Sequence, residues 1–204
     1  MRMRKKKNAE ARMNACSDYS IENPTELKGK WQELYGKGRK MFLEIGCGKG
    51  TFVTELAKRN PDNFYIALEV VPGVIMLAME KAKAQLPQNV SFLMSNRENL
   101  VKCLKDSDVI INCILWPKHR KDHLIYREDL KTMKRSAMIV DVACDDEGAV
   151  ETCRSTTHDA PTYYEEGILH YCVDNIPSAF SRTSSVRFSN DSLPFALEVA
   201  DKGV

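Results

Sequence analysis

The stretch from Met41 to Phe52, with the sequence MFLEIGCGKGTF, decides the fold. Its first five residues are an apolar run with one acid, which suits a buried parallel strand. The turn that follows has glycine at every second position, at Gly46, Gly48 and Gly50. Thr51 to Arg59 then predicts a helix. Strand, glycine turn and helix in this order open a nucleotide-binding βαβ unit, and we expect one here.

The spacing of these glycines differs from that of a dinucleotide-binding loop. Such a loop has the pattern G-x-G-x-x-G, with the helix N-terminus facing a pyrophosphate. Here the pattern is one residue shorter, and Glu44 precedes it at the end of the predicted strand. A carboxylate at this place opposes a pyrophosphate and favours the ammonium group of an amino-acid-bearing cofactor. An ordinary tight turn from strand to helix is the alternative.

A second acid ends the next predicted strand, which runs from Phe64 to Glu69. Glu69 follows the glycines by about twenty residues, the separation at which an acid accepts hydrogen bonds from a ribose diol. A surface acid without a ligand is the alternative. Pro72 then opens a predicted helix that extends to Gln85, and a third short strand follows at 89–94.

Length and composition suit one α/β domain. The chain has 204 residues, of which 43% are hydrophobic and 28% charged, as in an ordinary globular protein with a sizeable core. It has no apolar run of about 18 residues, and its first residues lack the apolar centre of a signal peptide. The seven cysteines do not have the spacing of metal ligands. We expect a cytoplasmic protein without a membrane span or a metal site.

The net charge is +2, so an affinity for nucleic acid must come from a local patch. The chain begins with one, which consists of Arg2, Arg4, Lys5, Lys6 and Lys7. This basic arm predicts contacts with RNA phosphates, and a solubilising tail is the alternative. Between the arm and the first strand we expect a helix from Thr25 to Tyr35.

Four motifs lie in register in the first part of the chain. They are MRMR at 1–4, NPxxxKGKW at 23–31, EIGCGKG at 44–50 and ALEVxPxVI at 67–75. Over residues 1–94 the chain therefore resembles bacterial tRNA (guanine-N7-)-methyltransferases. The resemblance implies S-adenosylmethionine as cofactor, bound by Glu44, the three glycines and Glu69. Asn96 stands where that family has an aspartate, and its amide can still bond the adenine amino group.

The same resemblance implies tRNA as the substrate, bound through the basic arm and through Lys118 in the sequence Trp116-Pro117-Lys118. The aspartate that precedes this sequence in the family is replaced here by Ile114 and Leu115, and a downstream Thr-Asp-Asn motif is missing. The function that we expect is therefore that of an S-adenosylmethionine-dependent methyltransferase of this type whose methyl transfer is impaired.

The second part of the chain contains different motifs. They include MIVDVACD at 138–145, GILHYCVDNIP at 167–177 and ADKG at 200–203. Over residues 95–204 the chain resembles the alanine dehydrogenase family, which includes the carboxyethyl-ornithine synthases. This resemblance implies NAD as an alternative cofactor, with Asp145 and Asn175 near the nicotinamide as weak catalytic candidates. It also implies that the substrate-activating lysine and histidine come from a preceding catalytic domain, which has no counterpart in these residues.

The two resemblances together predict a chimera joined near residue 94. We expect a basic arm and helix over 1–40, a cofactor-binding βαβαβ half over 41–94 and an alanine-dehydrogenase-like half over 95–204. Both families use a doubly wound sheet, so we expect one α/β domain with a mostly parallel, Rossmann-like sheet in three layers. Further strands are predicted near 108–115, 137–142 and 168–173. A final helix is predicted over 183–201, kinked at Pro194 and capped by Gly203.

Two alternatives to the methyltransferase function stay open. One is an NAD-dependent oxidoreductase of the alanine dehydrogenase and carboxyethyl-ornithine synthase family. The other is a non-catalytic Rossmann-like binding module. The sequence also leaves the oligomeric state open.

Overall fold

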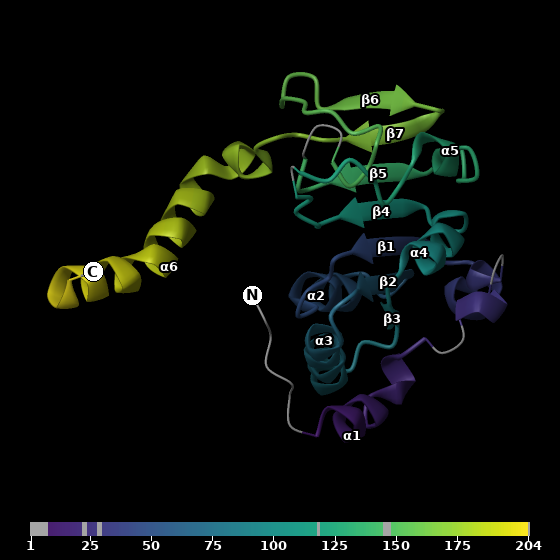
Figure 1. Ribbon diagram of the computed structural model, residues 1–204, viewed down its shortest axis with the longest axis horizontal. Helices are drawn as coiled ribbons and strands as arrows, with labels where there is room; N and C mark the ends of the chain where they lie inside the picture. Colours follow the sequence, from purple (N-terminus) through teal and green to yellow (C-terminus); the bar gives the residue numbers. More distant parts are fainter. Residues whose placement is uncertain (1–7, 22–23, 28–29, 118, 145–147, 204) are drawn as a thin grey trace.

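A seven-stranded, mostly parallel sheet organises the chain, with the strand order β3-β2-β1-β4-β5-β7-β6 (Figure 1). The structure is a computed structural model that describes residues 8–21, 24–27, 30–117, 119–144 and 148–203. The first six strands of this order run parallel, and β6 pairs antiparallel with β7 at the edge. Six parallel strands ordered 3-2-1-4-5-6 are the arrangement of dinucleotide-binding folds, and β7 takes the sixth place here.

The strands are β1 Lys40–Ile45, β2 Asn63–Glu69, β3 Val90–Met94, β4 Val109–Asn112, β5 Met138–Asp141, β6 Thr162–Glu165 and β7 Ile168–Tyr171. The α-helices are α1 Ala9–Asn14, α2 Thr51–Arg59, α3 Pro72–Gln85, α4 Arg97–Leu104, α5 Arg127–Leu130 and α6 Ser181–Lys202. Short helical turns complete the described structure: η1 Ser17–Tyr19, η2 Pro24–Leu27, η3 Gln32–Gly36 and η4 Ile176–Phe180.

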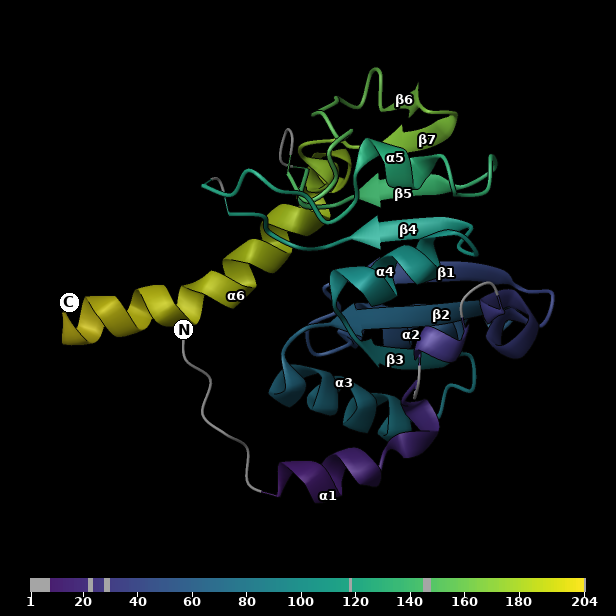
Figure 2. The ribbon, with the colours of Figure 1, turned by 45° about the vertical axis from the view of Figure 1, so that its right-hand side comes forward.

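Helices cover both faces of the sheet, so the molecule has three layers. Because side chains alternate along a strand, β1 contributes Leu43 to one face and Phe42 to the other. The Leu43 side packs with α4, α5 and η3, and the Phe42 side packs with α2 and α3. Figure 2 shows α4 in front of the sheet. The expectation of a doubly wound, three-layered α/β fold is confirmed.

The structure corrects the helix expected from Thr25 to Tyr35. The described part of this segment forms the 3₁₀ turn η2 and the π-helical turn η3 instead. The π turn places Trp31, which is fully buried, and Tyr35 over the sheet, with their ring centroids 5.8 Å apart. The packing of these two rings, of which Tyr35 is partly buried, outweighs the local preference for a regular helix.

Two further differences concern the second half of the sheet. The strand expected over 108–115 is shorter, since β4 ends at Asn112. The edge strand β6 was not expected; it forms a hairpin with β7 around Glu166 and Gly167. Both turn residues have positive φ, 50° and 80°, as a two-residue type I′ turn requires. Glu-Gly between two β-branched and aromatic stretches was therefore a usable hairpin signal.

Helix α6 extends away from the sheet in both ribbon views, and none of its residues is buried (Figure 1, Figure 2). The helix includes Pro194, and Gly203 caps it by donating its N–H to Val199 O at 2.9 Å. Its position and cap agree with the sequence expectation. Within the part of the chain that the structure describes, α6 and the other helices are too short or too polar to cross a membrane.

We predict that Gly50→Ala destabilises the fold by about 2–4 kcal/mol, whereas Gly48→Ala costs about 1 kcal/mol. Both glycines have positive φ, but a Cβ on Gly50 would lie 2.7 Å from the Cβ of Ala78, whereas one on Gly48 meets nothing within 4 Å. Urea unfolding of both variants measures the difference. Equal losses would show that α2 and α3 can move apart at no cost.

Candidate functional site

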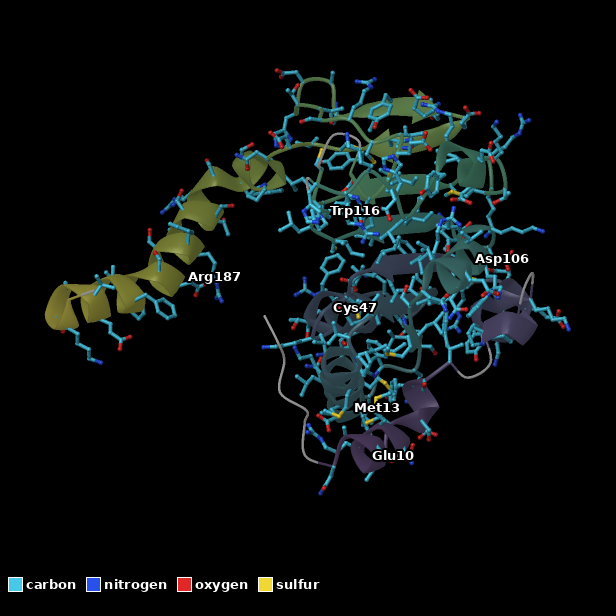
Figure 3. All side chains as sticks on the ribbon, viewed as in Figure 1. Glu10, Met13, Cys47, Asp106, Trp116 and Arg187 are labelled. Carbon is cyan, nitrogen blue, oxygen red and sulfur yellow. The ribbon has the colours of Figure 1, made fainter. Side chains whose placement is uncertain are left out.

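The candidate site is a crevice at the carboxyl ends of the parallel strands. In doubly wound folds, ligands bind where the strand order reverses, which is here between β1 and β4. A cavity of about 250 Å³ lies at this place. It is lined by Ile45, Gly46, Leu68, Glu69, Val70, Ser95, Cys113 and Ile114. Figure 3 shows Cys47, after β1, and Trp116, after β4, on this edge of the sheet.

The glycine turn between β1 and α2 forms one wall of the crevice. All three glycines have positive φ, with values of 81°, 55° and 67° at Gly46, Gly48 and Gly50. The N–H groups of Gly46 and Cys47 donate to Leu68 O at 2.9 and 3.0 Å, so the turn is held against the end of β2. Of the three glycines Gly46 lines the cavity, so the backbone forms the cavity wall there without a side chain in between.

Glu69 lies opposite this turn at the end of β2. Its Oε2 accepts a hydrogen bond from Gly48 N at 3.1 Å, and its Oε1 accepts from Val70 N and Val71 N at 2.8 and 3.0 Å. Three backbone donors therefore fix the carboxylate at the cavity wall. This is the position from which an acid bonds the hydroxyls of a ribose.

The start of α2 has the properties of an anion site. The helix follows Gly50 without a side-chain cap or an acid in its first turn among the described residues, which leaves the positive end of the helix dipole without a charged partner of its own. Lys49 is exposed in the turn, and Lys81 of α3 donates its ammonium hydrogen to Thr51 Oγ1. The helix dipole and two lysines therefore favour a phosphate here.

Glu44, which lies in β1 two residues before the turn, would oppose phosphate binding when it is ionised. Glu44 is only 5% exposed, and its Oε2 has no hydrogen-bond partner. Burial raises the pKa of Glu44 to about 7, since the charged form loses its hydration. The nearby thiol of Cys113 also has its pKa raised to about 11, first by burial and then by Glu44. Below pH 7 Glu44 is mainly neutral, and above pH 7 it adds a buried negative charge.

The structure thus brings Glu44, the three glycines and Glu69 together at the carboxyl ends of β1 and β2. Asn96 is exposed nearby, where its Oδ1 accepts from Asn99 N at 2.8 Å and caps α4. This cap explains the residue without a ligand, and its adenine contact stays a prediction.

Asn175 follows β7 and is exposed, and its carbonyl oxygen accepts from His158 Nε2 at 3.0 Å. Its contact with nicotinamide stays a prediction. The remaining candidates, Asp145, Lys118 and the basic arm, lie outside the described residues.

Several residues of the crevice were not singled out from the sequence. Ser95 and Cys113 line the cavity because they directly follow β3 and β4. Asn112 and Asp141 form a buried pair, with Asn112 Nδ2 donating to Asp141 Oδ1 at 3.0 Å, and the same oxygen accepts from Cys144 N at 2.9 Å. The pair anchors the loop after β5. The available signal was their position at the carboxyl ends of adjacent parallel strands.

Residues 73–204 match the family model of the alanine dehydrogenase/PNT C-terminal domain, which is more than half of the chain. The chain belongs to this family. Alanine dehydrogenase of Methanococcus maripaludis is 46% identical over 115 residues, which are 56% of this chain and 31% of the relative. Alanine dehydrogenase 1 of Staphylococcus aureus is 39% identical over 153 residues, 73% of this chain and 41% of the relative. The chain thus spans less than half the length of these family members.

Solved structures agree with the fold. An L-alanine dehydrogenase superposes with a TM-score of 0.65 over 96% of this chain and 55% of its own, at 24% identity. A transhydrogenase from Sinorhizobium meliloti superposes with a TM-score of 0.60 over 94% of this chain and 57% of its own, at 14% identity. At these identities the likeness establishes the Rossmann-like fold only.

The prediction of a methyltransferase function from the first half is wrong. The matching family model is that of the alanine dehydrogenase/PNT C-terminal domain, and the similar relatives are alanine dehydrogenases. S-adenosylmethionine as the main cofactor is likewise unsupported. The match begins at Gly73, inside α3, and so includes residues 73–94, which the sequence motifs had placed in the methyltransferase half. The physical reason is that a strand, a glycine turn and a ribose acid serve any adenosine-containing cofactor.

We predict that Glu44→Gln flattens the pH dependence of stability between pH 5 and pH 8. A carboxyl whose pKa is raised on folding stabilises the fold fully below its unfolded pKa of about 4.3, and this contribution is lost as pH rises through 7. Relative to the variant, the wild type should lose on the order of 3 kcal/mol of unfolding free energy over this range.

Urea unfolding at several pH values measures this loss. Glu55→Gln on α2 is the matched control, since Glu55 is partly exposed and pairs with Lys58 at 3.2 Å. Parallel curves for the wild type and Glu44→Gln would show that Glu44 titrates normally.

Proposed function

We propose that this chain binds NAD(H) in the crevice and forms the dinucleotide-binding part of an NAD-dependent oxidoreductase of the alanine dehydrogenase family. The observation that carries the proposal is the position of Glu69. It lies at the end of β2, opposite the glycine turn, in a sheet of dinucleotide-binding strand order. A carboxylate there bonds the 2′-hydroxyl of NAD and repels the 2′-phosphate of NADP.

The residues of the crevice fit the two ends of the adenosine diphosphate moiety. Glu69 would hold the ribose, and the N-terminus of α2, with Lys49 and Lys81, would hold the pyrophosphate. The glycine turn is one residue shorter than the usual dinucleotide loop, but Gly46, which lines the cavity, leaves the backbone open to a ligand there.

The nicotinamide would lie toward the other side of the switch point, near the loops that follow β4, β5 and β7. By family resemblance Asp145 and Asn175 belong to this end. The bound cofactor would donate or accept a hydride, while the chain orients its ring and excludes water. The buried Asn112–Asp141 pair supports this role because it fixes the β5 loop that leads to Asp145.

The names of the relatives suggest an amino acid and its 2-oxo acid as substrates. In the family that the sequence resembles, a lysine and a histidine of a preceding domain activate the substrate. We therefore propose that turnover requires such groups in addition to the residues of the crevice. Binding of the basic arm to tRNA, a separate expectation, stays a prediction.

We predict that Glu69→Gln weakens NADH binding at least tenfold, because hydrogen bonds to a charged acceptor contribute about 1.5–3 kcal/mol. The variant should also discriminate less between NADH and NADPH. Asp62→Asn is the matched control. Asp62 is exposed and directly precedes the amino-terminal end of β2, whereas Glu69 lies at the carboxyl end. Fluorescence titration measures both affinities. An unchanged affinity in Glu69→Gln, with the fold intact by circular dichroism, would contradict the proposed binding mode.

A further inference from the structure

Glu44 is the feature of the crevice that the proposed function does not use. It lies two residues before the glycine turn, between Ala67 of β2 and Ile111 of β4 in the register of the sheet. It shares the face of Ala67, which packs with α2 and α3. Its carboxyl is therefore enclosed beneath the turn and the start of α2, where the pyrophosphate would be held.

The surroundings of Glu44 do not neutralise its charge. Among the described residues it forms no ion pair, and its Oε2 has no hydrogen-bond donor. The titratable groups around it are the Cys47 thiol of the turn and the Cys113 thiol after β4, with Glu69 beyond Cys47. Burial raises the pKa of both thiols, so they stay uncharged at neutral pH.

The two lysines of the anion site, Lys49 and Lys81, do not neutralise Glu44. Lys81 is engaged with Thr51, and Lys49 extends from the turn as an exposed side chain. Neither lysine pairs with Glu44 in the described structure. An ionised Glu44 would therefore repel a pyrophosphate across a dry, weakly screened interior.

Resting on the proposed function, we propose that Glu44 couples dinucleotide binding to the uptake of one proton. The neutral acid admits the pyrophosphate, and the ionised acid excludes it. The proton comes from the solvent and binds to the carboxyl group of Glu44, whose unpartnered Oε2 is thereby able to donate a hydrogen bond. Since Glu44 titrates near neutrality, the coupling would operate in the physiological pH range.

The proposal distinguishes ligands by charge. NADH carries a pyrophosphate that stays fully ionised from pH 6.5 to 8.5, so its affinity should fall with rising pH. The limiting slope is about tenfold per pH unit, because one proton is bound with the ligand. Adenosine has the same ribose and base without the phosphates, and its affinity should not follow this slope.

Isothermal titration calorimetry tests the coupling with NADH and adenosine at pH 6.5, 7.5 and 8.5. Repeating each titration in buffers of different ionisation enthalpy gives the number of protons taken up. For the wild type and NADH we expect a value that approaches one at pH 8.5. Glu44→Gln should take up no proton and should bind about thirtyfold more tightly than the wild type at that pH, which lies about 1.5 units above the pKa of Glu44. Glu55→Gln is the control and should match the wild type.

The outcomes separate the two proposals. Equal proton uptake by the wild type and Glu44→Gln, with NADH bound, would overturn the role of Glu44 and leave the proposed function intact. NADH binding that is absent in the wild type at pH 8.5 and restored by Glu44→Gln would support the role. Absence of NADH binding in both proteins at every pH would overturn both proposals.

Discussion

The attachment of the glycine turn to the end of β2 is the constraint on which the site depends. The carbonyl of Leu68 holds the N–H groups of Gly46 and Cys47, and the Glu69 carboxylate holds that of Gly48. These bonds fix the turn, the start of α2 and the ribose acid relative to one another. A ligand that spans the crevice therefore meets donors and acceptors that are already in place, which lowers the entropic cost of binding.

Much of the fold was accessible from the sequence because its signals are local. The helix Thr51–Arg59 follows a glycine turn, and Pro72 starts α3 at its first position. The parallel strands are apolar runs, as expected of strands buried on both faces. The segment around Trp31 was not accessible in this way, because its π turn depends on the packing of Tyr35 against Phe64 of β2 rather than on local sequence signals.

The site was only partly accessible from the sequence, for a related reason. Glu44 and Glu69 were recognisable from their spacing to the glycines, but spacing alone did not separate one adenosine-containing cofactor from another. The burial of Glu44 raises its pKa and so favours its neutral form, which opposes a phosphate far less than the ionised form does. Burial depends on how α2 and α3 cover β1, and this information is distributed over the whole first half of the chain.

The segment before β1 has a consequence of its own. Ile21 N donates a hydrogen bond to Phe92 O at 2.9 Å. The guanidinium group of Arg12 donates two hydrogen bonds, of 2.6 and 2.7 Å, to the carboxylate of Glu80 in α3. The segment thereby occupies the outer rim of β3, whose backbone groups would otherwise be open to strands of other molecules. At the far rim, β6 is a short strand of four residues with an acid at its end. The bridge between Ser20 and Phe92 thus occupies part of the β3 edge, and the opposite edge strand is short; both features oppose strand addition between molecules.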